Sequence, residues 1–266
     1  MEIERGLIRT KAGHIHYRAA GQGMPVMLCH INQQSSALML ELMQVLAGRF
    51  RPIAIDYPSH GHSDHVAEQP SIDDYAASAL AVMDALGVEK AAVMGEAVGA
   101  AVSIALSSAN PDRIVRAVLV NCPFYPDRSV ADRSHAPLKS GLRPADPSGF
   151  PTTRTIEFML GQDPGHAPVN PSQSWMDRIN VAQLEVGRDR WQALDALHDF
   201  DIVGRLGQIR CPVLLLMGEH FHYVPYMDQF SARLPGLKSE IIPGGRFCMT
   251  WERAEEVGRK AMDFFA

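Results

Sequence analysis

Short apolar runs alternate with longer amphipathic segments along much of this chain. The runs at 25–30, 90–94 and 114–121 are almost continuously apolar, as expected of parallel strands that are buried on both faces. The segments with helical spacing that lie between and around them are 36–47, 72–86 and 97–108. Alternating strands and helices predict an α/β protein with a doubly wound, mostly parallel sheet.

The two ends of the chain complete this pattern. At the start, residues 3–10 and 14–19 predict an antiparallel hairpin across Lys11, Ala12 and Gly13. The elements expected near the end are a strand that ends at Gly218, a helix at 226–234, a strand at 238–242 and a last helix from Trp251. The predicted sheet therefore has about eight strands.

The alternation is interrupted after Cys122. Residues 122–206 are richer in Pro, Arg, Asp and Ser, and they contain no apolar strand-like run. Helical spacing recurs there at 152–160, 172–185 and 189–200. We therefore predict a core domain formed by residues 1–121 and 207–266, with a helical cap at 122–206 inserted in it.

The segment from Gly95 to Gly99 lies where a buried strand turns into a helix. Its two glycines have the spacing of the nucleophile elbow, G-x-S-x-G, in which a serine occupies the central position. Here the central residue is Ala97, which carries no nucleophilic atom. The glycines suit a tight, strained turn with close packing of helix on strand, so we predict a positive φ at Ala97.

Six segments resemble those of the α/β-hydrolase fold superfamily, in the same order along the chain. They are 25–30, which ends in the His of a His-Gly motif, and 53–64, 95–99, 110–121, 211–220 and 243–253. The resemblance implies the fold of that family with a helical cap. Carried over to this chain, the family's serine, acid and histidine positions fall on Ala97, Phe221 and Phe247. The resemblance thus implies a member that has lost the Ser-Asp-His triad.

In such a fold the ligand site lies beyond the carboxyl ends of the strands, around the elbow. Glu96 stands beside the position of the missing serine and is the first candidate for a general acid or base, followed by His30 and His222. The backbone N–H groups of Ile31 and Val98 are the candidate oxyanion-hole donors. The side chains expected to line the substrate site are those of Ala97, Cys122, Tyr125, Phe221 and Phe247.

Each candidate also has a structural interpretation. Glu96 can hold a neighbouring loop, His30 can support the oxyanion loop by hydrogen bonding, and His222 can lie exposed in its loop. Two functions therefore remain open. One is an enzyme that performs lyase, isomerase, cyclase, decarboxylase or water-addition chemistry without a covalent intermediate. The other is a catalytically inert pseudoenzyme that binds a ligand or a partner, similar in kind to the N-myc downstream-regulated family.

Composition narrows the partners and the location. The net charge of −5 over 266 residues argues against a nucleic-acid surface, and no apolar run is long enough to span a bilayer. The first residues lack a basic start followed by an apolar core, so no secretory leader is expected. Four cysteines without C-x-x-C spacing predict free thiols in a reducing, cytoplasmic location. We expect an apolar small-molecule ligand and no cofactor, metal, nucleic-acid or membrane partner; a homodimer is left open.

Overall fold

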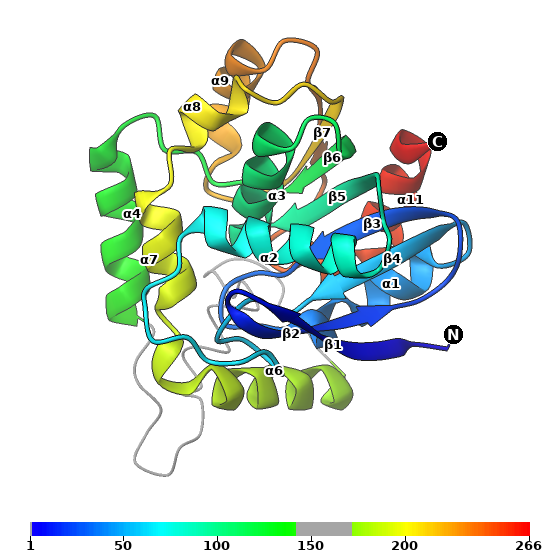
Figure 1. Ribbon diagram of the computed structural model, residues 1–266. Helices are drawn as coiled ribbons and strands as arrows, with labels where there is room; N and C mark the ends of the chain where they lie inside the picture. The colour runs from blue at the N-terminus through cyan, green and yellow to red at the C-terminus, as the bar shows by residue number, and fades with distance from the viewer. Residues whose placement is uncertain (1, 142–171) are drawn as a thin grey trace.

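The computed structural model describes residues 2–141 and 172–266. Its centre is an eight-stranded sheet with the order β1-β2-β4-β3-β5-β6-β7-β8 (Figure 1). Strand β1 (Glu4–Thr10) forms an antiparallel hairpin with β2 (Gly13–Ala19), which pairs antiparallel with β4 (Phe50–Ile55). The remaining strands, all in parallel pairs, are β3 (Met24–Cys29), β5 (Ala91–Glu96), β6 (Ile114–Val120), β7 (Val213–Gly218) and β8 (Lys238–Ile242). The predicted hairpin and the mostly parallel sheet are confirmed.

Helices cover both faces of the sheet, which is why the central strands are apolar throughout. On one face α2 (Ile72–Ala85) packs against α3 (Val98–Ala109), and on the other α1 (Leu40–Leu46) packs against α11 (Ala254–Phe265) (Figure 1). Successive residues of β5 point to opposite faces. Val93 enters the apolar cluster beneath α2 and α3, whereas Met94 enters the one beneath α1 and α11.

Several element boundaries differ from the sequence prediction. The predicted helix at 36–47 starts with a short 3₁₀ helix, η1 (Ser36–Met39), before α1. The helix predicted to start at Trp251 is two helices, α10 (Met249–Glu252) and α11, because Arg253 leaves helical geometry between them, with φ −119° and ψ 28°. Cys248, with a left-handed φ of 65°, precedes α10. The helix expected at 226–234 is η3 (Val224–Tyr226) followed by α9 (Met227–Arg233).

All the described elements between β6 and β7 are helical. They are α4 (Arg128–Gly141), α6 (Gln173–Val186), η2 (Gly187–Asp189), α7 (Gln192–Asp199) and α8 (Ile202–Leu206). The helices predicted at 172–185 and 189–200 match α6 and α7, while the one predicted at 152–160 lies outside the described residues. The division of the chain into core and cap stays a prediction. Across residues 2–141 and 172–266, none of the helices is both long and apolar enough to cross a bilayer.

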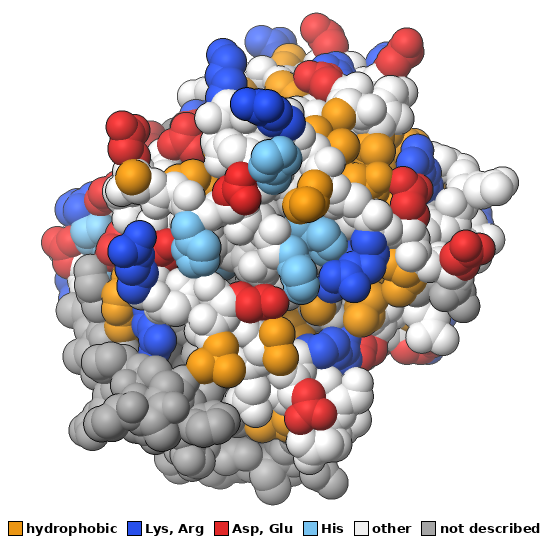
Figure 2. Space-filling model, turned by 60° about the horizontal axis from the view of Figure 1, so that its bottom comes forward, with side chains coloured by type: hydrophobic (Ala, Val, Ile, Leu, Met, Phe, Trp, Pro, Cys, Tyr) orange, Lys and Arg blue, Asp and Glu red, His pale blue; other side chains and the backbone are white. Residues whose placement is uncertain are grey.

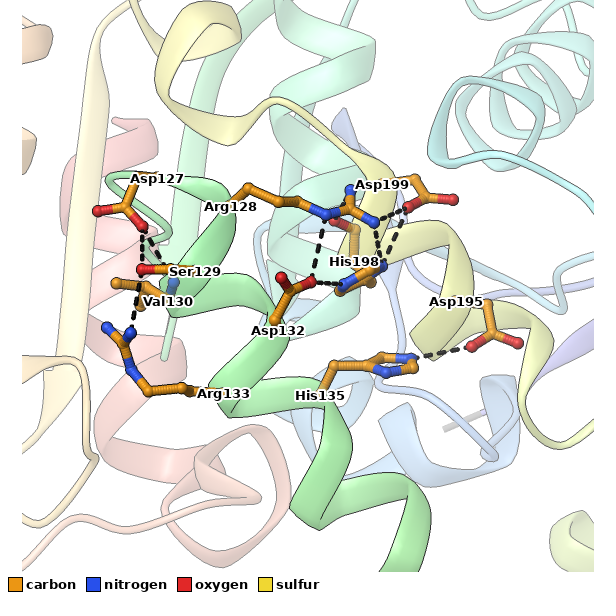
Figure 3. Close-up of polar contacts among 10 residues, drawn as sticks. All are labelled: Asp127, Arg128, Ser129, Val130, Asp132, Arg133, His135, Asp195, His198 and Asp199. Carbon is orange, nitrogen blue, oxygen red and sulfur yellow. Dashed lines mark hydrogen bonds and ion pairs between the residues drawn. The ribbon is translucent and has the colours of Figure 1, made fainter.

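Helix α4, which the apolar pattern did not predict, is tied to α7 by polar contacts (Figure 3). His135 Nε2 lies 2.8 Å from Asp195 Oδ1, and His198 Nε2 lies 2.8 Å from Asp132 Oδ1. The centroids of the two imidazole rings lie 4.5 Å apart, and the ring planes are tilted by 38°. Arg128 donates to Asp199 across the same junction at 3.0 Å. Hydrogen bonds and ion pairs therefore help to hold α4 against α7.

Acid will loosen α4 from α7. The hydrogen bond from His198 holds the pKa of Asp132 below its usual range. A carboxyl group whose pKa is lowered by folding stabilises the folded state above its unfolded pKa of about 3.9, and this contribution is lost as the pH falls through the folded value. Hydrogen exchange in α4, corrected for intrinsic rates, should therefore speed up relative to α3 below about pH 4. Asp132→Asn should show the faster exchange already at neutral pH; equal protection of α4 in both proteins would contradict this.

Candidate functional site

Ala97 occupies a strained turn between β5 and α3. Its backbone has φ 52° and ψ −111°, which confirms the predicted positive φ. A Cβ atom on Gly99 would collide with the carbonyl group of Cys29, and one on Gly95 would collide with the carbonyl group of Gly99. Both glycines are thus required by the close approach of helix to strand. The geometry of the elbow is present, with alanine at its tip.

Ala97 packs within a cluster of apolar side chains. It belongs to a cluster with Ile31, Leu38, Trp175, Ile179 and Cys248, against which Met176, Phe247 and Trp251 also pack. Trp175 comes from α6, is fully buried, and stacks on Trp251 with centroids 3.7 Å apart and ring planes 22° from parallel. A helix from the 122–206 region therefore covers the elbow. The indole N–H of Trp175 is buried and has no hydrogen-bond partner among the described residues.

Two further aromatic side chains lie together at the carboxyl end of the sheet. Phe221 follows β7 and is buried, and Phe247 lies in the loop before α10 and is half-buried. Their rings are stacked, with centroids 6.1 Å apart and planes 16° from parallel. The structure thus brings together the two positions that the sequence assigned to the family's acid and histidine, and Phe247 also contacts the cluster around Ala97.

Glu96 is fully buried and accepts four hydrogen bonds. Its Oε1 atom accepts from the N–H of Met249 and from Asn121 Nδ2, both at 2.9 Å. Its Oε2 atom accepts from the N–H of Thr250 at 2.9 Å and from the Thr250 hydroxyl at 2.7 Å. These bonds fix the start of α10 to the end of β5. Cys248, whose backbone is left-handed, lies immediately before the residues that are held in this way. The geometry favours a positioning role for Glu96; its acid–base role stays a prediction.

His30 is also fully buried, and both of its ring nitrogens face hydrogen-bonding groups. Nδ1 donates to the Ile31 carbonyl at 2.6 Å, and Nε2 accepts from the Tyr57 N–H at 3.4 Å. Burial, aided by the neighbouring His60, lowers the pKa of His30 to about 3, so the ring is neutral near pH 7. This arrangement favours the structural interpretation, in which His30 supports the loop of Ile31.

The remaining predicted residues lie at different depths. His222 is exposed, beside the rings of Phe221 and Tyr223. Cys122 is buried, and burial raises the pKa of its thiol, which disfavours the reactive thiolate. Tyr125 is half-buried and packs edge-on against Tyr223, with centroids 5.7 Å apart. None of the three is among the residues clustered around Ala97.

The two predicted oxyanion donors retain free N–H groups within the described part of the chain. Val98 is the first residue of α3, and the first N–H groups of a helix have no partner within it. No backbone hydrogen bond is found from the N–H of Val98 or Ile31 to another described residue. Ile31 packs in the cluster around Ala97. Two amides thus remain available beside the elbow.

The chain is similar to known proteins in sequence and in fold. A family model described as alpha/beta hydrolase fold matches residues 24–254. Haloalkane dehalogenase 2 of Mycobacterium bovis is 33% identical over 179 residues, which are 65% of this chain and only 60% of the dehalogenase. The 2-hydroxy-6-oxononadienedioate/2-hydroxy-6-oxononatrienedioate hydrolase 2 of Pseudomonas putida is 25% identical over 274 residues, covering 94% of this chain and 91% of that enzyme. The crystal structure of a bromoperoxidase from Bacillus anthracis has a TM-score of 0.82 at 19% identity, covering 98% of this chain and 99% of that one, and shares the fold.

Proposed function

Because this chain belongs to the α/β-hydrolase fold family, we propose that it uses the family's elbow to bind an apolar small molecule without capturing it covalently. Covalent capture needs a nucleophile, a base beside it and a group that orients the base. The expected positions carry Ala97, Phe221 and Phe247, and none of these side chains can take any of the three roles. The observation that carries the proposal is the apolar cluster around Ala97, in which two stacked indoles adjoin the turn.

The same residues indicate the class of ligand. Aromatic side chains beside the elbow, such as Trp175 and Phe247, favour a flat, apolar molecule. Offset or edge-on ring contacts contribute about 0.5–1.5 kcal/mol beyond burial. The N–H groups of Val98 and Ile31 suit a carbonyl, enolate or carboxylate oxygen. An aromatic or conjugated compound that bears one such oxygen fits both features.

A thermal-shift screen of aromatic carbonyl compounds tests this proposal. A ligand that binds only the folded state raises the melting temperature, and the stabilisation grows with the logarithm of the ratio of its concentration to its Kd. Ala97→Leu should weaken such a ligand at least about tenfold, because the larger side chain competes with the ligand at the tip of the elbow. Ala232→Leu, on the exposed face of α9, is the matched control and should bind as the wild type does. Equal affinity in the Ala97→Leu and wild-type proteins would exclude the elbow as the binding site.

A second candidate function is non-covalent acid–base catalysis on the same ligand. It is supported by relatives that are named as enzymes and by the amides beside the elbow, which suit a developing oxyanion. Glu96, His30 and His222 are then the proposed proton-transfer groups. Liquid chromatography coupled to mass spectrometry of the ligand after incubation separates the two functions: a changed ligand mass or retention time supports catalysis, and an unaltered ligand supports binding alone. A cytoplasmic location stays a prediction, and a homodimer stays open.

A further inference from the structure

A second group of polar side chains lies outside the apolar cluster around Ala97. Figure 2 shows histidine side chains beside acidic and basic ones on the face that forms the bottom of Figure 1, where α6 lies. In the part of the chain that the structure describes, one set of His, Cys, Asp or Glu residues has the spacing of a metal site: His16, Asp56 and His62. They come from β2, from the end of β4 and from the loop that follows it.

The distances between the three potential ligand atoms suit a shared cation. Asp56 Oδ2 lies 2.8 Å from His16 Nδ1 and 3.9 Å from His62 Nδ1, and all three atoms lie within 4.8 Å of one another. Two ligands that each bind Zn²⁺ at about 2.1 Å lie roughly 3–3.5 Å apart. His16 and Asp56 are buried and fixed, whereas the His62 side chain is 48% exposed and can turn to complete the set.

The Asp56 carboxylate is fixed by hydrogen bonds beside the two histidines. Asp56 is fully buried, and it lies between β2 and the loop that carries His62. The N–H of Ser36 donates to Oδ1, whereas Oδ2 accepts from His16 Nδ1 at 2.8 Å and from the backbone N–H of His62 at 3.0 Å. One oxygen of an ionised carboxylate therefore points at both histidines.

Glu185, on α6, supplies the outer contact that metal-binding histidines commonly have. Its Oε1 atom lies 3.7 Å from His62 Nε2, the nitrogen opposite the one that faces Asp56. A histidine that binds a metal through one nitrogen usually donates its other N–H to a carboxylate or carbonyl oxygen.

We propose that His16, Asp56 and His62 bind a divalent transition-metal ion such as Zn²⁺, with Glu185 supporting His62 from α6. Two neutral imidazoles and one carboxylate suit zinc-like cations better than Mg²⁺ or Ca²⁺, which prefer oxygen ligands. Two cations oppose the ion: Arg5 Nε lies 3.4 Å from His16 Nε2, and the buried Arg18 lies close enough to Asp56 to interact with it. We therefore expect a Kd on the order of 10 µM, weaker than that of a closed structural zinc site.

Isothermal titration of the chelator-treated full chain with ZnCl₂ tests the proposal. The wild type should bind one ion per chain, and His62→Gln should bind at least about tenfold more weakly because a ligand is lost. His65→Gln removes an imidazole of similar exposure that pairs with Asp189, and should bind as the wild type does. Glu185→Gln should weaken binding by about tenfold through His62.

The fold tolerates these tests, since His62 and His65 are both half-exposed. Co²⁺ offers a second readout, because coordination by imidazole and carboxylate gives visible absorption bands that should appear in the wild type and be lost in His62→Gln. The proposal is overturned if the wild type shows no saturable binding. It is overturned equally if His62→Gln binds as tightly as His65→Gln, since the ion then lies elsewhere.

Discussion

Replacing Glu96 with glutamine will lower the free energy of unfolding by about 2–4 kcal/mol. The carboxylate accepts four hydrogen bonds in a fully buried site, from Asn121, Met249 and Thr250. An amide replaces one acceptor oxygen with an NH₂ group, so at least one buried donor must face another donor. Chemical denaturation of both proteins measures the difference. Glu89→Gln, at an exposed position, controls for the loss of charge and should change stability by less than about 0.5 kcal/mol.

This variant also separates the two roles considered for Glu96. A positioning role predicts that Glu96→Gln weakens ligand binding as well as stability, because Phe247 and Cys248 precede the residues that the carboxylate holds. An acid–base role predicts unchanged ligand affinity with turnover reduced by about 10²–10⁴-fold. Wild-type stability in Glu96→Gln, together with lost turnover, would contradict the positioning role.

Replacing Trp175 with alanine will lower the free energy of unfolding by about 3–5 kcal/mol and open a cavity over Ala97. Trp175 is fully buried between Trp251 and the elbow cluster, so its removal leaves a space lined by apolar groups. Free indole should then raise the melting temperature of the variant by binding in that space, and should have little effect on the wild type.

Trp191→Ala provides the matched control. Trp191 also belongs to the chain segment that connects β6 to β7. Its side chain is only partly buried and is outside the cluster around Ala97. We expect a smaller loss of stability and no rescue by indole. Equal rescue of both variants would mean that indole binds elsewhere on the protein, and the assignment of Trp175 to the elbow would fail.

The elbow and the sheet could be predicted because their signals are local. The apolar strand, the two glycines and the small residues of α3 occupy one continuous stretch of chain, and close packing of helix on strand needs them. The assignment of Phe221 and Phe247 to the family's acid and histidine positions came from the resemblance to a known family. The two residues lie in loops that follow different strands, so neither local segment indicates that they meet. Their stacking could not be read from either segment alone.

The partners of Glu96 and Trp175 could not be predicted, for a different reason. Thr250 lies 154 residues from Glu96 along the chain, and nothing in either segment signals that they meet. Trp175 lies in a segment with helical spacing, but its position over Ala97 depends on how α6 docks. Helix α4 was not predicted, because polar pairs such as His198 and Asp132 help to hold it in place. Such pairs leave no apolar pattern in the sequence.

The intact mass of the protein after treatment with a fluorophosphonate tests the central claim most directly. The reagent forms a stable covalent adduct with an activated serine, and an active serine hydrolase treated in parallel confirms that it is reactive. With Ala97 at the elbow and phenylalanines at the other two positions, we predict no mass increase in the wild type. We predict no stoichiometric adduct in Ala97→Ser either, because a serine without a base stays a weak nucleophile. A stoichiometric wild-type adduct, mapped to a residue beside Ala97, would show that the chain captures substrates covalently and would contradict the account.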